Sequence, residues 1–327
     1  MIIKLTKQNE NKIYDITQMV EGVDWCGSVD SVARTVDIMV INAPYDDNLS
    51  SLPRPATGDF VTLIEDKEIF SGRIFGIEKT SEDGTVTVNC IDNLQYLLKS
   101  KCNYNFKNTT AEAITAQVLA DIQFPVGELA STGVNIKSML CQGDTFYDII
   151  MQAYTRAHKA NQKLYMCLLK ENKLSVIEKG IIVSNYKLSE GLNITKSSFT
   201  ESTESIVNKV KIYDDKGTQV GEITDDESIK KYGVFQDLYT VEEGVNQNTA
   251  ANLMLTQPEQ DLSIEAIGDK KCLSGYGVTV EDSITGMKGI YWIRSDKHSF
   301  KDGIHNMELE LSFRNLMNEK ESQEEGK

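Results

Sequence analysis

The stretch Gly58-Asp-Phe-Val-Thr-Leu-Ile-Glu-Asp66 has a counterpart near the end of the chain, Gly275-Tyr-Gly-Val-Thr-Val-Glu-Asp282. Each is followed by a glycine-containing strand, then by a turn that ends in Asp-Gly, and then by a strand in which apolar and polar residues alternate. Asp-Gly turns are common in β-hairpins, so convergent hairpin chemistry is one explanation. The recurrence of all four features in the same order favours another, a duplicated β-barrel split by an insertion.

The first copy of this repeat lies in residues 1–100, which have the pattern of β structure. In the strand expected at 85–90, Val86, Val88 and Cys90 fall on one face. Short alternating strands separated by turn residues are typical of a barrel or sandwich. The turns of the two copies are 79–84 and 297–303, and further strands of the first copy are predicted at 35–41, 60–64 and 69–77.

Residues 101–190 have a different pattern and predict a small α+β module. Thr109 as an N-cap and Glu112 three residues later form a capping box for a first helix. A second helix is predicted to begin near Asp144 or Thr145. Two strands, 163–169 and 173–177, then form a predicted hairpin.

From 191 to 318 the pattern predicts a second β-barrel with a helical insert near 225–258. One helix of the insert is expected at 226–232, closed by Gly233, and another at 249–256. Residues 319–327 are polar and charged, which predicts a disordered tail. The predicted fold class is therefore α+β, mainly β, with two related β-barrel domains separated by a small α+β module.

The 327 residues carry a formal net charge of −15. This argues against a general nucleic-acid binder, because binding to phosphates requires a basic surface. The charge either serves solubility or forms an acidic surface past which DNA can slide. The first residues form no apolar signal segment and no stretch has the length of a membrane span, so we expect a cytoplasmic protein.

No pattern indicates a catalytic residue, a cofactor or a metal. The histidines are His158, His298 and His305, and the last two lie seven residues apart without a ligand pattern, so we expect a turn or interface role for His298. Gly275-Tyr-Gly277 precedes a strand and is not a dinucleotide motif. The acidic runs 225–227 and 242–243 are expected to be solvated. The six cysteines contain no CxxC pair and are expected to be small buried side chains.

Two features each have two interpretations. Residues 144–147 are either a docking edge for a partner or a helix cap followed by core aromatic residues. Trp25 and Trp292 are either anchors of an interface or packing residues of a barrel.

Duplication has a consequence for assembly, because a trimer of a two-barrel chain presents six similar barrels in a ring. The chain also resembles the hub proteins of contractile tails, which include the XkdQ-like proteins of defective prophages, the late control D proteins and the N-terminal part of VgrG. The resemblance implies a homotrimeric ring around a channel between tail tube and central spike. It rests on residues 58–72, 83–84, 90–92, 142–150, 226–233, 291–294 and 298, followed by the closing strand.

We therefore expect a structural baseplate hub and not an enzyme. It would join a six-fold tube protein to a three-fold spike protein around an acidic channel, contact other baseplate proteins and bind no specific nucleic acid. It would assemble in the cytoplasm and leave with the released particle, which is a phage, a prophage or a tail-like bacteriocin. Two alternatives stay open: a cell-wall-binding or peptidoglycan-degrading component of the same particle, and a free carbohydrate-binding module.

Overall fold

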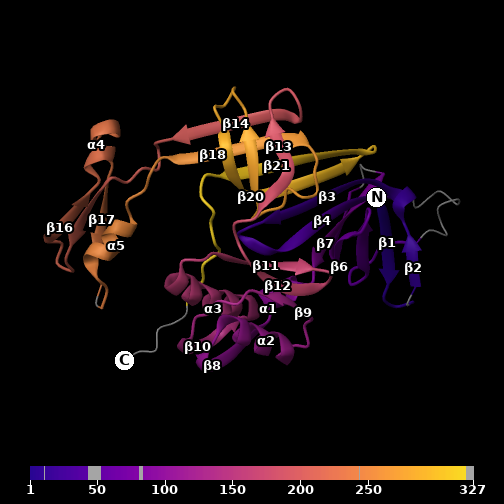
Figure 1. The fold of residues 1–327 in the computed structure, drawn as a ribbon, viewed down its shortest axis with the longest axis horizontal. Helices are drawn as coiled ribbons and strands as arrows, with labels where there is room; N and C mark the ends of the chain where they lie inside the picture. Colours follow the sequence, from indigo (N-terminus) through magenta and orange to yellow (C-terminus); the bar gives the residue numbers. More distant parts are fainter. Residues whose placement is uncertain (11, 43–52, 81–83, 243, 322–327) are drawn as a thin grey trace. The chain divides into compact units, whose positions relative to one another are not determined.

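The computed structural model describes residues 1–10, 12–42, 53–80, 84–242 and 244–321 (Figure 1). By contacts the chain divides into two compact units, of which the first is Met1–Lys196 with Ile264–Lys327 and the second is Ser197–Ser263. Parts of the predictions fall outside the described residues, namely turn residues 81–83, Glu243 and tail residues 322–327. No helix in the described ranges is long and apolar enough to cross a membrane.

The first copy of the repeat is a run of antiparallel strands. Its strands lie side by side in the order β3-β4-β7-β6-β5-β1, with β2 beyond β1. Alternate residues point into its core, as predicted for Val86, Val88 and Cys90, which are all buried. The elements are β1 (Ile2–Lys7), β2 (Lys12–Asp15), the 3-10 helix η1 (Thr17–Met19), β3 (Val20–Ser28), β4 (Ser31–Ile41), β5 (Phe60–Ile64), β6 (Glu68–Lys79) and β7 (Thr85–Asp92).

The second copy uses six strands in the same relative order, β14-β18-β21-β20-β19-β13. One difference is that β13 runs parallel to β19, whereas β1 runs antiparallel to β5. The strands are β13 (Ile182–Ser189), β14 (Ile194–Ser202), β18 (Glu259–Ile267), β19 (Gly277–Glu281), β20 (Lys288–Lys301) and β21 (Ile304–Ser312).

The two quoted stretches adopt the same backbone structure. Gly58 and Gly275 both have φ +89°, a value that disfavours side chains with a Cβ. The N–H of Gly58 donates to the carbonyl of Ile74 (2.9 Å), and the N–H of Gly275 donates to the carbonyl of Ile293 (2.8 Å). A β-bulge follows at once in each copy, between residues 74 and 76 and between residues 293 and 295. This shared geometry supports duplication over convergent hairpin chemistry.

The prediction of two separate barrels does not describe how the copies are joined. Within the described residues no closed barrel is found, and both copies contribute to one 13-stranded sheet. The reason is the length of β20: residues 288–292 pair with β19, and residues 295–301 pair with β3 of the first copy. We call this pairing of β3 with β20 the joint.

The middle of the chain is the predicted α+β region. Thr110, not Thr109, caps the first helix and accepts from the N–H of Ala113, whereas Glu112 accepts from Ser131 and Thr132. The second helix begins after Thr145, as predicted. The elements are α1 (Gln95–Lys99), β8 (Lys101–Thr109), α2 (Ala111–Asp121), β9 (Val126–Leu129), β10 (Ile136–Thr145), α3 (Phe146–Asn161), β11 (Tyr165–Lys170) and β12 (Lys173–Glu178).

The second unit contains the predicted helical insert around a small core of Val210, Ile212 and Ala251. Its first helix has the predicted bounds, with Gly233 as the C-cap. Its other elements are β15 (Lys209–Tyr213), β16 (Gln219–Thr224), α4 (Asp226–Tyr232), β17 (Gln236–Thr240) and α5 (Gln247–Leu253).

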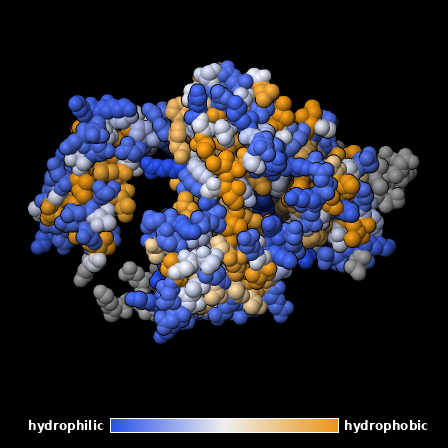
Figure 2. Space-filling model, in the orientation of Figure 1, coloured by the Kyte–Doolittle hydropathy of each residue, from blue (hydrophilic) through white to orange (hydrophobic). Residues whose placement is uncertain are grey.

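Residues 319–321, where the predicted disordered tail begins, pack against α3 within the first unit. The backbone N–H of Lys320 donates to the hydroxyl of Thr155 on α3 (3.1 Å), and Glu321 forms an ion pair with Lys159 (2.6 Å). Residues 319–321 are therefore ordered by contacts with α3. In the view of Figure 2, bands of hydrophobic residues interrupt a largely hydrophilic surface.

Candidate functional site

A buried ion pair connects the two copies beside the joint. Asp296 on β20 is 2% exposed and accepts from Nη1 of Arg34 on β4 (3.1 Å) and also from Nη2. The N–H of Ser274 donates to the same carboxylate (2.6 Å). A buried carboxylate needs such donors, because removing it from water without partners is costly.

Trp25 on β3 completes this contact. The Arg34 guanidinium lies 4.3 Å from the centroid of the Trp25 ring, in the geometry of a cation–π interaction. Gly27 leaves the room that the guanidinium occupies, because a Cβ there would overlap it. Trp25 is 3% exposed, so it is a packing residue of the joint inside one chain.

His298 is fully buried within β20 and is not a turn residue, which corrects the first of its two expected roles. Its Nδ1 lies 3.0 Å from Nε2 of His305, and its Nε2 lies 3.1 Å from the carbonyl of Cys272. Burial lowers the pKa of His298 to about 4, although the nearby Asp296 acts in the opposite direction. The imidazole is therefore neutral at pH 7 and packs 5.3 Å from the Trp25 ring.

Asp92 anchors the start of the middle region. Its two carboxylate oxygens accept from the N–H of Arg34 (3.0 Å) and from the N–H of Leu94 (2.9 Å). Burial raises the pKa of Asp92 to about 6, against the effect of these two hydrogen bonds. Both oxygens are occupied by backbone donors, so the geometry indicates a structural role for Asp92.

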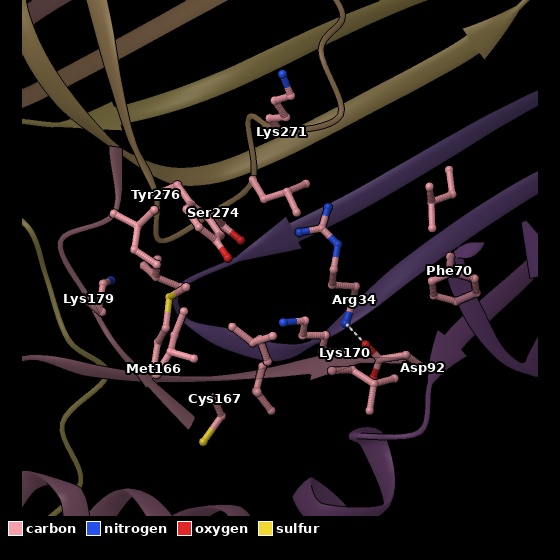
Figure 3. Close-up of a pocket in the computed structure, with 18 of the residues that line it drawn as sticks. Arg34, Phe70, Asp92, Met166, Cys167, Lys170, Lys179, Lys271, Ser274 and Tyr276 are labelled. Carbon is pink, nitrogen blue, oxygen red and sulfur yellow. Dashed lines mark hydrogen bonds between the residues drawn. The ribbon is translucent and has the colours of Figure 1, made fainter. Parts of the chain in front are cut away.

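A cavity of about 1370 Å³ opens where the two copies and the middle region meet. In Figure 3, Arg34 and Asp92 are joined by the marked hydrogen bond, and the labelled lysines come from different segments, with Lys271 pointing away from the other side chains. Burial lowers the pKa of Lys179 to about 8, and its Nζ donates to the carbonyl of Leu316, so the end of the chain reaches this region. The other labelled side chains are Phe70, Met166, Cys167, Lys170, Lys271, Ser274 and Tyr276.

One face of the sheet carries polar side chains that bond to one another across neighbouring strands. Asn89 on β7 donates to Asp37 on β4 (2.8 Å), and Ser299 on β20 donates to Asp24 on β3 (2.6 Å). Strand registers and the alternation of burial place six carboxylates on this face, against Lys196, Lys297 and Lys301. They are Asp24, Asp37, Glu78, Glu265, Glu308 and Glu310. We call this surface the acidic face.

The structure settles several of the other candidates. Thr145 caps α3 by accepting from the N–H of Asp148 (3.0 Å), and Phe146 and Tyr147 are buried, so residues 144–147 are a helix cap with core aromatic residues. Asp225 caps α4 in the same way, which explains part of the acidic run 225–227.

Two further candidates lie apart from each other. His158 is near the end of α3, where its Nδ1 lies 3.0 Å from the carbonyl of Lys163. Trp292 is half-buried and packs beside Gly277. Across the described ranges, no group of three or more His, Cys, Asp or Glu side chains could hold a metal ion.

The Arg34–Asp296 pair was missed by sequence analysis. The two residues are 262 positions apart and neither belongs to a motif. The repeat in the sequence implies a contact between the two copies, but it does not indicate which residues form that contact.

Comparisons with known proteins are consistent with this architecture. The family described as YQBQ-like matches residues 23–312. The uncharacterized protein YqbQ of Bacillus subtilis is 31% identical over 259 residues, covering 76% of this chain and 79% of that protein. The PBSX phage-like element protein XkdQ of the same organism is 28% identical over 321 residues, covering 92% and 94%. Among solved structures, the 43 kDa tail protein of prophage MuSo2 from Shewanella oneidensis has a TM-score of 0.68 at 16% identity, covering 95% and 98%.

Proposed function

Since the chain belongs to the YQBQ-like family, we propose that it is a structural component of a phage-like tail and serves there as the baseplate hub. XkdQ is by name a protein of a phage-like element, and the MuSo2 structure is by name that of a tail protein. A hub joins a tail tube to a central spike, so it must offer a repeated surface to the tube. The observation that carries the proposal is the duplicated strand order within one sheet.

Duplication lets one chain contribute two similar units to a ring. In a homotrimer, the first copy (β1 to β7) and the second copy (β13, β14 and β18 to β21) supply six similar units, which match a six-fold tube, while the three-fold axis matches a spike. The α+β module between β7 and β13 then lies between the two copies in sequence, and the second copy begins with β13 at Ile182, earlier than the predicted residue 191. The polar joint supports this role, because it fixes one copy against the other with a buried ion pair.

The acidic face supports a channel lining. Its six carboxylates against three lysines give it a net negative charge, and Asn89 and Ser299 donate to two of those carboxylates. Facing the lumen, this surface repels DNA phosphates and offers them no binding site. The proposed role is mechanical and requires no catalytic residue.

Solution mass tests the hub proposal. The chain has a mass of 36.6 kDa, and light scattering after size exclusion is expected to give a trimer of about 110 kDa for the chain alone, or a heavier complex that contains three chains when the tube and spike proteins of the same particle are added. A chain that remains monomeric in every mixture contradicts the proposal. Release of dye from labelled peptidoglycan by the pure protein would instead favour the alternative of a wall-degrading component.

A further inference from the structure

Several strand edges of the duplicated sheet lack a partner strand within the described residues, those of the terminal strands β2, β13 and β14 and part of one edge of β6. β14 ends the sheet and pairs only with β18. Residues 68–73 of β6 pair with β5, and Ile74 forms two further backbone hydrogen bonds on the same edge. Beyond Ile74, this edge of β6 faces no described strand. Unpaired strand edges are templates for pairing with another chain.

The joint shows what such edges can do in this fold. β3 lies antiparallel to β20, with Trp25 opposite His298. Ion pairs cross the same joint, between Asp24 and Lys297 (3.0 Å) and between Glu21 and Lys301 (3.2 Å). Because β3 and β20 belong to different copies of the repeat, the joint is a copy-to-copy contact that already exists within one chain.

The free edges of β14 and β6 belong to the counterparts of the two strands that form the joint. In the shared strand order, β14 takes the place of β3 and β6 takes the place of β20. β3 and β14 are both nine residues long, and the sixth residue of each is aromatic, Trp25 and Phe199. Trp25 is 3% exposed, whereas Phe199 is 39% exposed. Phe199 therefore lacks the cover that the joint gives Trp25.

Registers after the bulge identify the matching residue on β6. In the pairing of β6 with β7, Ile74 lies opposite Cys90, and Lys79 lies opposite Val86. In the equivalent pairing of β20 with β21, Ile293 lies opposite Leu311, and His298 lies opposite Met307. Counting from the bulge, Lys79 occupies the position in β6 that His298 occupies in β20.

We propose that β14 of one copy pairs antiparallel with the free edge of β6 in the next copy, with Phe199 facing Lys79. The contact repeats the joint between chains and buries Phe199 as the joint buries Trp25. It is heterologous, so it closes into a ring when the rotation between copies permits. This inference rests on the proposed function and adds the strands and residues of its trimer seam.

Paired cysteines test the seam in the full chain. Directly opposite residues in a sheet have Cβ atoms roughly 4.5–5.5 Å apart, close enough for a disulfide after small adjustments. The K79C/F199C variant is expected to give covalent dimers and trimers on a denaturing gel after mild oxidation. An equimolar mixture of K79C and F199C is expected to give covalent dimers only, and the wild type, with its native cysteines, none.

A charge variant provides a second measurement. Phe199→Asp is expected to abolish the trimer measured by light scattering without lowering the melting temperature of the monomer. Leu192→Asp is the matched control, because Leu192 is 74% exposed and lies in the turn before β14. The control is expected to form trimers like the wild type.

The outcomes separate this seam from the hub proposal. If the wild type is a trimer but K79C/F199C gives no cross-link and Phe199→Asp leaves the trimer intact, the seam is overturned and the hub proposal stands. Covalent dimers from F199C alone overturn it too, because they indicate a symmetric β14-to-β14 contact. A chain that stays monomeric with the tube and spike proteins overturns both proposals.

Discussion

Replacing Arg34 by Met is expected to loosen the joint between the two copies. The substitution keeps an apolar stem of similar length beside Trp25 but leaves the Asp296 carboxylate, 2% exposed, with the N–H of Ser274 (2.6 Å) and the more distant Nε2 of His298 (3.4 Å). Removing one partner of a buried ion pair costs about 3–5 kcal/mol, because an uncompensated charge stays in the interior. The free energy of unfolding is expected to fall by that amount.

Urea unfolding at pH 7.5 measures this loss. Tryptophan emission reports the first unit alone, because the chain has 2 tryptophans and both Trp25 and Trp292 lie in that unit. With a denaturant slope of about 1–3 kcal/mol per molar urea, the midpoint is expected to fall by about 1 M or more. Asp296→Asn in the Arg34→Met background removes the uncompensated charge, so the double variant is expected to be more stable than Arg34→Met.

Arg294 supplies the matched control. It pairs with Asp30 at 3.3 Å near the same joint, but the two side chains are 53% and 65% exposed. Exposed pairs contribute about 0–1 kcal/mol, so Arg294→Met is expected to shift the midpoint little. If Arg34→Met destabilises the first unit no more than Arg294→Met does, the buried pair does not hold the copies together.

Three further changes test other parts of the reasoning. Gly27→Ala is expected to displace the Arg34 guanidinium and to be costly in the wild type but nearly neutral in Arg34→Met, as urea midpoints would show. The pKa of His298 is lowered from 6.5 to about 4 in the folded state. Between these pH values the unfolded state binds a proton on His298 and the folded state does not. The free energy of unfolding is therefore expected to fall as pH drops from 6.5 to about 4, by up to about 3 kcal/mol. His298→Gln should flatten this slope relative to the wild type, whereas the raised pKa of Asp92 acts oppositely in both proteins; an unchanged slope would refute the assignment. Reversing Asp37, Glu308 and Glu310 to Lys is expected to create salt-sensitive binding of duplex DNA in a gel-shift assay, stronger than the same change at Glu68, Glu128 and Glu171, which are exposed and off the acidic face.

Local elements followed from the sequence where short-range chemistry decides them. The strand at 60–64 and the helix at 226–232 have their predicted bounds, because alternation, a capping Asp225 and Gly233 act over a few residues. The cap of α2 lies one residue later than predicted, at Thr110, because Thr109 is still paired with Ile136 at the end of β8. Neighbouring hydroxyl residues compete for the same cap, and contacts distant in sequence decide between them.

The duplication could be read from the sequence, because Gly58 and Gly275 stand at equivalent turns whose positive φ limits which residues fit. How the copies meet could not be read, since β20 pairs with β19 along its first half and with β3 along its second, and no pattern within β20 marks that change. The same holds for Arg34 and Asp296, which meet across 262 positions only after the sheet has formed. Periodicity and turn chemistry fix short segments, whereas strand partners and buried charge pairs depend on which surfaces the folded chain brings together.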